Sequence, residues 1–262
     1  MKKILFIVIA VTTAFVACKK DDENGDAGTG IIDYIEKQEF SGGDSIHHNY
    51  VISFSYDASS RIAEISETHY IIDKGGKQEP HGKEVMVVTY KGNTASTERS
   101  SYYPKEGDWE LNYTYNDNFT LDSDGKISQF SQEGKYTSNY EYDNGCLIKI
   151  NGYDAYSGMN IEWSNGDLVK AGDSDLTYSS KANPFADTID ITVHALNDWY
   201  PAPLYFYAAG LFGKHSAHLV ESSGDTNYTY EKDSKGRISK MIHSYTYEGK
   251  SHKTLQYVIH YK

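Results

Sequence analysis

The sequence predicts an all-β fold, a twisted antiparallel sheet built from repeated β-hairpins with one short helix or helical turn. Its 262 residues include 24 Tyr, 9 Phe and 3 Trp, and aromatic side chains suit a pleated, half-buried surface better than a helix. A hairpin pattern also recurs five times along the chain. The acidic balance, 37 Asp and Glu against 25 Lys and Arg, argues against a nucleic-acid partner, which would need clustered basic side chains.

The first 17 residues have the features of a secretory signal peptide. Lys2 and Lys3 precede an apolar run, Ile4 to Val16, that is too short to cross a bilayer. The residues before Cys18 resemble a bacterial lipobox. That resemblance implies cleavage before Cys18 and acylation of this residue, with palmitate as a typical acyl chain. We therefore expect a lipid anchor on Cys18 that holds the protein on the outer membrane.

Residues 18–30 are expected to be a flexible, acidic tether. The segment is polar, contains three Gly and cannot bury enough surface to fold. Its first residues, Cys-Lys-Lys-Asp-Asp-Glu, are similar to the acidic export signal of surface lipoproteins of gut Gram-negative bacteria. This similarity implies the outer face of the outer membrane, whereas a plain solvated charge run would leave the periplasmic face open.

Residues 31–262 are expected to form a single hairpin-repeat domain. Each copy of the repeat has two aromatic or apolar residues at i and i+2, a turn, and then an aliphatic residue. The copies are 54–65, 113–130, 140–150, 161–171 and 228–241, and the aliphatic residues are Ile62, Ile127, Leu147, Leu168 and Ile238. Asn144-Gly145 and Asn165-Gly166 suit two-residue turns that need positive φ. The pattern does not say whether the sheet is open or closed.

An insertion at about 181–223 interrupts the repeat. Ile189, Ile191 and Val193 alternate with polar residues and predict a strand. Pro203 to Leu211 is apolar without alternation, and it predicts the short helix or helical turn. We expect the insertion to pack over one face or one end of the sheet.

Two resemblances follow from these residues. Tyr-x-Tyr-Asp followed by Gly-Arg-Ile resembles the YD-type repeats of bacterial surface and toxin-shell proteins, which implies the hairpin geometry. The order of Asn183-Pro184-Phe185, the Gly210 to Leu219 segment and the 228–241 repeat is similar to an uncharacterised lipoprotein family of gut Gram-negative bacteria with a domain of unknown function. This chain has His218 where members often have Lys. The resemblance implies a lipobox and an acidic tether, and it implies no activity.

Aromatic residues outside the repeat are the candidate ligand-binding residues. They are Trp109, Trp199, Tyr200, Tyr102 and Tyr103. Flat rings with polar tips suit the faces of sugars. The pairs within the pattern, such as Tyr113/Tyr115, Tyr140/Tyr142 and Tyr245/Tyr247, are instead expected to pack in the sheet as cross-strand ladders.

The sequence carries no recognised catalytic, cofactor or metal motif. There is no His-Glu-x-x-His, nucleophile elbow, phosphate loop or dinucleotide fingerprint. A calcium loop aligned on Gly125 would place Thr120 and Ser131 at key ligand positions, so this segment is read as a turn. We therefore assign no catalytic residue and expect no metal and no cofactor. Cys146 is expected to be a partly buried, unreactive thiol.

These observations favour a surface-anchored lipoprotein that acts as a non-enzymatic binding or interaction module for a glycan or an envelope protein. Two alternatives stay open. A carbohydrate-active hydrolase would place two carboxylates across a cleft lined by Trp109 or Trp199. A structural envelope protein would have no ligand site.

Overall fold

The computed structural model describes residues 32–41, 45–132, 136–152, 158, 160–185 and 210–262, and all regular structure within them is β-strand. The strands are β1 (Ile32–Phe40), β2 (Ile46–Tyr56), β3 (Ile62–Ile72), β4 (Gln78–Lys91), β5 (Thr94–Lys105), β6 (Asp108–Leu121), β7 (Ile127–Gln132), β8 (Tyr136–Asp143), β9 (Cys146–Gly152), β10 (Ile161–Ser164), β11 (Asp167–Ala171), β12 (Ser174–Ala182), β13 (His218–Ser223), β14 (Thr226–Lys232), β15 (Ile238–Tyr247) and β16 (Lys250–Tyr261). The all-β antiparallel prediction is therefore confirmed.

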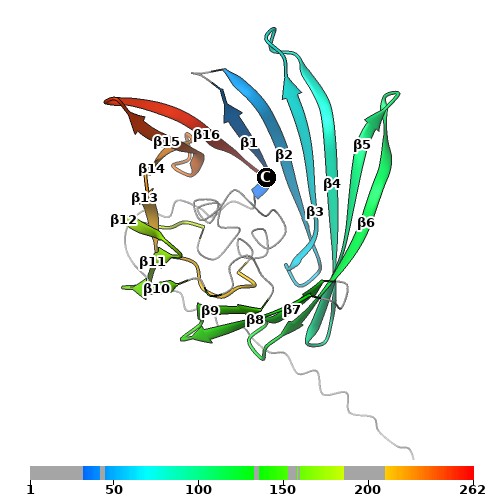
Figure 1. The fold of residues 1–262 in the computed structure, drawn as a ribbon, viewed down its shortest axis with the longest axis vertical. Helices are drawn as coiled ribbons and strands as arrows, with labels where there is room; N and C mark the ends of the chain where they lie inside the picture. Colours follow the sequence, from blue (N-terminus) through cyan, green and yellow to red (C-terminus); the bar gives the residue numbers. More distant parts are fainter. Residues whose placement is uncertain (1–31, 42–44, 133–135, 153–157, 159, 186–209) are drawn as a thin grey trace, which may run out of the picture.

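The strands form one nearly closed, barrel-like sheet. Apart from β9 and β10, each described strand pairs antiparallel with the next strand in sequence, and β16 pairs with β1, which joins the two ends of the domain. The two edges of the sheet are β9 and β10, so the ring is interrupted inside the chain. Figure 1 shows the strands arranged around a ring, with β9 and β10 next to each other.

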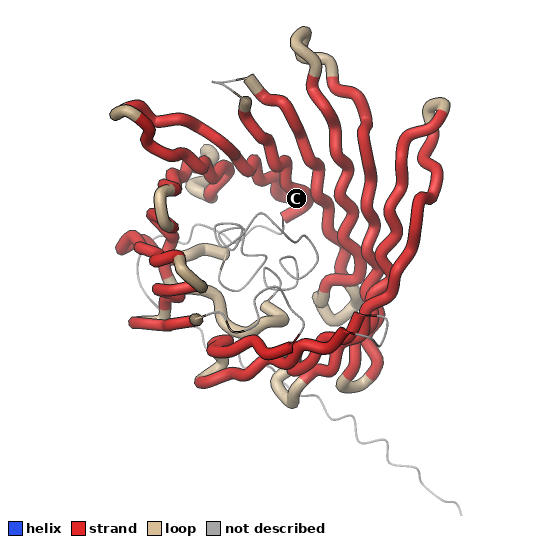
Figure 2. The backbone as a smooth tube through the Cα atoms, in the orientation of Figure 1, coloured by secondary structure: helices blue, strands red, loops and turns tan. Residues whose placement is uncertain are grey.

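The turns of this meander gather at two ends of the ring, visible as tan segments in Figure 2. One end, the strap end, carries the turns at 57–61, 122–126 and 233–237 and the start of β1 at Ile32. The other, the flared end, carries the turns after β3, β5 and β15. At the strap end a repeated aspartate shapes the turns: Asp57, Asp122 and Asp233 each accept two backbone N–H bonds, and each is paired with a basic residue four positions later.

The Asn-Gly turns form as the sequence predicts. Asn144 and Gly145 have φ of 49° and 83°, and Asn165 and Gly166 have φ of 53° and 87°. Positive φ at both central residues matches the right-handed twist of the flanking strands.

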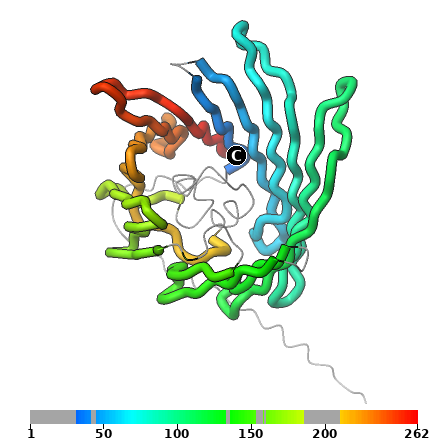
Figure 3. Tube along the Cα trace, viewed as in Figure 1, coloured from blue at the N-terminus to red at the C-terminus, as the bar shows by residue number. Residues whose placement is uncertain are grey.

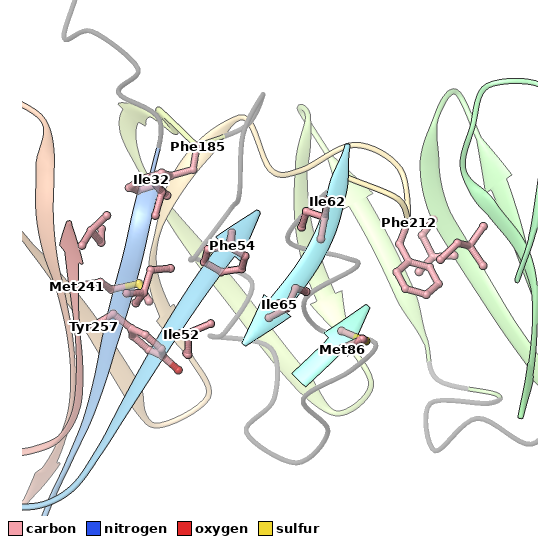
Figure 4. Close-up of a cluster of buried hydrophobic side chains, with 14 of the residues drawn as sticks. Ile32, Ile52, Phe54, Ile62, Ile65, Met86, Phe185, Phe212, Met241 and Tyr257 are labelled. Carbon is pink, nitrogen blue, oxygen red and sulfur yellow. The ribbon is translucent and has the colours of Figure 1, made fainter. Parts of the chain in front are cut away.

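The apolar core lies on the inner face of the ring. One cluster of buried side chains joins residues from both halves of the ring, from Ile35 and Ile52 to Tyr140 and Met241, and Figure 4 shows part of it. Only the inner faces of a curled sheet converge, so these side chains identify the inner face. The outer face is polar, as the paired row of Ser53, Ser66, Val85, Ser100 and Thr114 illustrates.

A side-chain hydrogen bond recurs between neighbouring strands at the strap end. Two residues after a buried apolar or aromatic side chain, a Tyr hydroxyl donates to the carbonyl of an aliphatic residue near the start of the preceding strand. The bonds are Tyr142 to Ile127 (2.6 Å), Tyr178 to Leu168 (2.7 Å), Tyr230 to Val220 (2.8 Å) and Tyr261 to Ile238 (2.6 Å). This recurring bond links neighbouring strands at the strap end in addition to their backbone hydrogen bonds.

The described ends of the insertion divide between the sheet, where His218–Ser223 forms strand β13, and segments that pack against the ring. Phe185 and Phe212 are buried in the core. The segment 210–217, the strap, is the gold segment inside the ring in Figure 3. The predicted strand at 189–193 lies outside the described residues, as does most of the predicted helix at 203–211. Its last residues begin a turn in which the Gly213 N–H donates to the Gly210 carbonyl, 3.1 Å away.

The strap crosses the gap between the sheet edges. The Leu211 carbonyl accepts the Ile127 N–H (2.7 Å), the Lys214 N–H donates to Gly145 (2.8 Å), and the Ala217 N–H donates to Gly166 (3.0 Å). Gly145 lies in the turn before β9, and Gly166 lies in the turn after β10. Backbone hydrogen bonds therefore connect the two edges at this end of the ring.

Candidate functional site

The predicted ligand residues are partly brought together. Tyr102, Tyr103 and Trp109 lie near the tip of the β5–β6 hairpin, where Tyr103 pairs with Glu110 and Pro104 pairs with Trp109. Trp199 and Tyr200, together with the predicted lipidation site Cys18, lie outside the described residues.

The three described candidates divide between the two faces of the sheet. Alternation along β5 places Tyr102 on the same face as Ser100, which is the outer face, and Trp109 pairs with Pro104 on that face too. Tyr103 lies on the inner face, where a hydrogen bond with Glu110 is the main cause that raises the pKa of its hydroxyl. The predicted set does not form one site.

Outside the core, the inner face of β5 and β6 carries a partly exposed aromatic cluster. Arg99 pairs in register with the core residue Met86 and with Tyr115, so all three face inward. The Arg99 guanidinium lies 4.0 Å from the centre of the Tyr115 ring. Tyr113 stacks on Tyr115 with ring centres 5.4 Å apart and an interplanar angle of 16°. Tyr113 is 45% exposed, so one ring of the stack is open to solvent.

A similar cluster lies on β15 and β16. Tyr245 and Tyr247 follow the buried Met241 and His243 at intervals of two residues, which places them on the inner face. Tyr245 stacks on His252 with ring centres 5.3 Å apart. Tyr245 is 40% exposed and Tyr247 is 60% exposed, so this platform also meets solvent at the flared end.

Histidines lie between the two clusters, on β2 and β3. Nδ1 of His48 and Nε2 of His69 are 2.8 Å apart, and Tyr50 stacks on His69 with ring centres 4.3 Å apart. Burial, followed by the neighbouring histidines, lowers the pKa of His69 to about 4. No group of three or more His, Cys, Asp or Glu in the described ranges is arranged to hold a metal ion.

These residues define an inner aromatic face at the flared end. Its members are Tyr50, His69, Tyr113, Tyr115, Tyr245, Tyr247 and His252. Rings with one open side can stack on a flat ligand, while hydroxyl, imidazole and guanidinium groups at their edges can form hydrogen bonds with it. Because the face is lined by several neighbouring strands, it suits an extended ligand.

The sequence interpretation missed this face because Tyr113, Tyr115, Tyr245 and Tyr247 belong to aromatic pairs that were expected to pack in the sheet. The pairs at Phe54, Tyr140 and Tyr228 start with a buried ring, as expected of core packing. Tyr113 and Tyr245 carry the same pattern but lie where the strands extend past the core. Strand length distinguishes the two kinds of pair: β6, which carries Tyr113, has 14 residues, whereas β8, which carries Tyr140, has 8.

One inner pair of carboxylates lies side by side, unlike the facing pair that the hydrolase alternative requires. Trp109, one of the two tryptophans expected to line a catalytic cleft, lies on the outer face. On the inner face Glu67 and Glu84 are direct partners on the adjacent strands β3 and β4. Side-by-side carboxylates on one sheet do not face one another across a bound sugar, as glycoside hydrolysis requires.

Comparisons with known proteins identify the fold. No protein-family model and no curated protein matches the chain. A solved porin-like protein from Bacteroides uniformis is similar to it with a TM-score of 0.62 and 16% identity, over 88% of this chain and 98% of that one. A porin-like protein from Bacteroides vulgatus aligns over 89% and 99% with 13% identity, at a TM-score of 0.29. No helix among the described residues is long and apolar enough to span a membrane.

Proposed function

We propose that the protein is a lipid-anchored protein of the outer membrane that binds a glycan on its inner aromatic face and catalyses no reaction. The lipobox-like residues before Cys18 support the anchor. The tether joins the domain at Ile32, at the strap end. The inner aromatic face lies at the opposite, flared end, so a ligand would approach from the side away from the anchor.

The polarity of the sheet supports attachment through Cys18 over insertion of the strands. A barrel that spans a membrane has an apolar band on its outer face and polar residues inside. Here Ile52, Ile65 and Met86 point inward, whereas the outer row Ser55, Glu64, Val87, Glu98 and Asn116 carries two carboxylates. Such a face favours contact with water over contact with lipid tails.

The observation that carries the glycan proposal is the stack of Tyr113 on Tyr115 with Arg99 beneath it. The Arg99 side chain covers one side of Tyr115 and holds this ring in place, and the open side of Tyr113 is free to contact a sugar ring. Aromatic rings already fixed by packing bind with a small loss of conformational entropy.

The test uses a matched pair of double substitutions on the same hairpin. Tyr113→Ala with Tyr115→Ala removes rings from the inner face, and Tyr102→Ala with Trp109→Ala removes rings from the outer face. On a glycan array, we expect the wild-type chain and the outer-face variant to bind the same saccharides and the inner-face variant to lose them. Binding that survives the inner-face change, or a wild-type protein that binds no saccharide at high concentration, would refute the proposal.

A protein partner from the envelope is the second candidate, and the outer face of the same hairpin favours it. Leu111 pairs with Tyr102 beside Trp109 and is 53% exposed. Exposed aliphatic and aromatic side chains on a projecting hairpin are typical of contacts with other proteins. If the outer-face variant loses a co-purifying envelope protein and keeps saccharide binding, both surfaces are functional.

A further inference from the structure

We infer that the ligand of the inner aromatic face is acidic, and that Arg99 binds its carboxylate or sulfate group. This inference rests on the proposed glycan function and names the substrate class. It is carried by the environment of Arg99, which differs from that of the other two arginines in the chain.

Arg61 and Arg237 are structural. Arg61 forms an ion pair with Asp57 (2.7 Å), and Arg237 forms one with Asp233 (2.8 Å). Both pairs lie within strap-end turns, and both guanidinium groups also pack on tyrosine rings, at 4.0 Å and 4.1 Å. In these two cases an aspartate four residues earlier satisfies the arginine charge.

Arg99 also packs on a tyrosine ring, but the residue four positions before it is Ala95 in place of an aspartate. Its guanidinium lies on Tyr115 at the same distance, 4.0 Å, but no carboxylate in the described part of the chain forms an ion pair with it. Its Nε is buried and has no hydrogen-bond acceptor there. An arginine left without a carboxylate is unusual in a chain with a formal charge of −12, where acidic side chains outnumber basic ones.

The geometry suits an oxyanion. A guanidinium stacked on a ring keeps the N–H groups along its edge free to donate in its own plane, and two parallel N–H groups match the two oxygens of a carboxylate or sulfate. Tyr113, in the same stack, offers its exposed ring to the sugar that carries this group. Arg99 and Tyr113 would thus contact one acidic sugar unit.

The carboxylates around Arg99 limit how much negative charge the ligand can carry. Glu84 lies two residues from Met86 and Asp117 lies two residues from Tyr115, and both face inward. Burial is the main cause that raises the pKa of Tyr115 to about 12, and the charges of Glu84 and Asp117 contribute to this shift. Glu67 lies opposite Glu84. These groups would repel a densely charged polymer. The site therefore suits a saccharide with isolated acidic groups.

The test compares saccharides that differ only at the acidic group. The probes are an oligosaccharide whose one charged unit is a glucuronic acid, the same molecule after reduction of its carboxyl group to an alcohol, and the monosulfated analogue of the reduced form. Each is titrated by calorimetry into the full-length chain in detergent, with Arg99→Gln, Arg99→Lys and the control Arg61→Gln. Thermal unfolding of each variant confirms that it is folded.

We expect the wild type to bind an acidic form about tenfold or more tightly than the reduced form, since charge-assisted bonds of this kind have such an effect. The carboxylate and sulfate arms show which anion is preferred. Arg99→Gln should abolish the preference, so that its affinities for the three forms lie within about twofold of one another, Arg99→Lys should keep part of the preference, and Arg61→Gln should keep all of it. Equal affinity of the wild type for all forms, or a preference that survives Arg99→Gln, would overturn this inference alone. If the wild type binds none of the three saccharides, the proposed glycan function is overturned as well.

Discussion

The indole N–H of Trp163 donates a hydrogen bond of 2.8 Å to the backbone carbonyl of Leu147. Trp163 lies on β10 and Leu147 on β9, the two edges of the sheet. In other strand pairs a tyrosine hydroxyl donates to the carbonyl at the corresponding place in the preceding strand, as Tyr261 does to Ile238. The tryptophan therefore makes the repeat contact where no strand ladder exists, and with the strap it holds the ring together.

Replacing Trp163 with Phe removes this contact and keeps most of the ring volume. We expect a loss of about 1–2 kcal/mol in the free energy of unfolding, the usual effect of leaving a carbonyl in a buried region without a donor. The amide protons of β9 and β10 should also exchange faster with solvent. Denaturant unfolding and hydrogen exchange measure the two effects.

The matched control is Tyr261→Phe, which removes the equivalent bond between β15 and β16. We expect a similar loss of stability, but unchanged exchange at β9 and β10, because the backbone ladder holds β15 to β16. If Trp163→Phe leaves exchange at β9 and β10 as slow as in the wild type, the indole bond does not hold the edges together.

Gly213 is predicted to be essential to the strap. It has a φ of 97°, and a Cβ added there would lie 2.4 Å from the Gly145 carbonyl oxygen. Gly213→Ala should therefore cost about 3 kcal/mol or more, because strain in the left-handed region adds to a backbone clash. Gly236→Ala is the control, with a φ of 80° and no atom within 4 Å, and should cost about 1 kcal/mol. If Gly213→Ala and Gly236→Ala lose the same stability in thermal unfolding, the strap moves freely.

Stability is predicted to fall in mild acid through His243 and His69. Burial is the main cause that lowers their pKa values, to about 3 for His243 and about 4 for His69. In the unfolded chain both titrate near 6.5, so between pH 6.5 and 4 the unfolded state binds protons that the folded state does not. As the pH is lowered through this window, the free energy of unfolding must therefore decrease, by at most about 1.4 kcal/mol per pH unit for each histidine.

His243→Gln should flatten this dependence, since it removes the more deeply buried of the two groups. Denaturant unfolding at pH 7, 6 and 5 gives the slope for wild type and variant. A variant that loses stability as steeply as the wild type would show that His243 is not the source.

Cys146 is predicted to react slowly with thiol reagents. Its side chain is partly buried, and burial is the main cause that raises the pKa of the thiol, so little of the reactive thiolate is present at neutral pH. Labelling of the native protein should be much slower than labelling in denaturant. Equal rates would show that the thiol is open to solvent.

The sequence was sufficient to predict the hairpins, because their determinants are local. The Asn-Gly turns and the alternation around Phe54, Tyr140 and Tyr228 each lie within about 20 residues. Closure of the ring depends on the pairing of β1 with β16, which places Gln38 opposite Gln256. No local pattern encodes that contact, so an open and a closed sheet were equally compatible with the repeat.

The candidate site could be predicted only in part, for a related reason. Of the predicted ligand residues, Tyr103 lies on the inner face, whereas Tyr102 and Trp109 lie on the other side of the sheet. A β-bulge between Ser101 and Tyr102 changes the register of the hairpin, and bulges are hard to locate from sequence. Tyr113 and Tyr245 share the pattern of the core pairs, and only the extent of the core along the strands distinguishes them.

The most direct test of the central proposal is an NMR titration of the full chain with its tyrosine rings labelled with ¹³C, using an acidic oligosaccharide. We predict that the ring signals of Tyr113 and Tyr115, assigned through single Tyr→Phe substitutions, shift on binding, while those of the buried Tyr140 and Tyr228 do not. Shifts confined to Tyr102 on the outer face, or no shifts at saturating saccharide, would contradict the proposal that the inner aromatic face is the binding site.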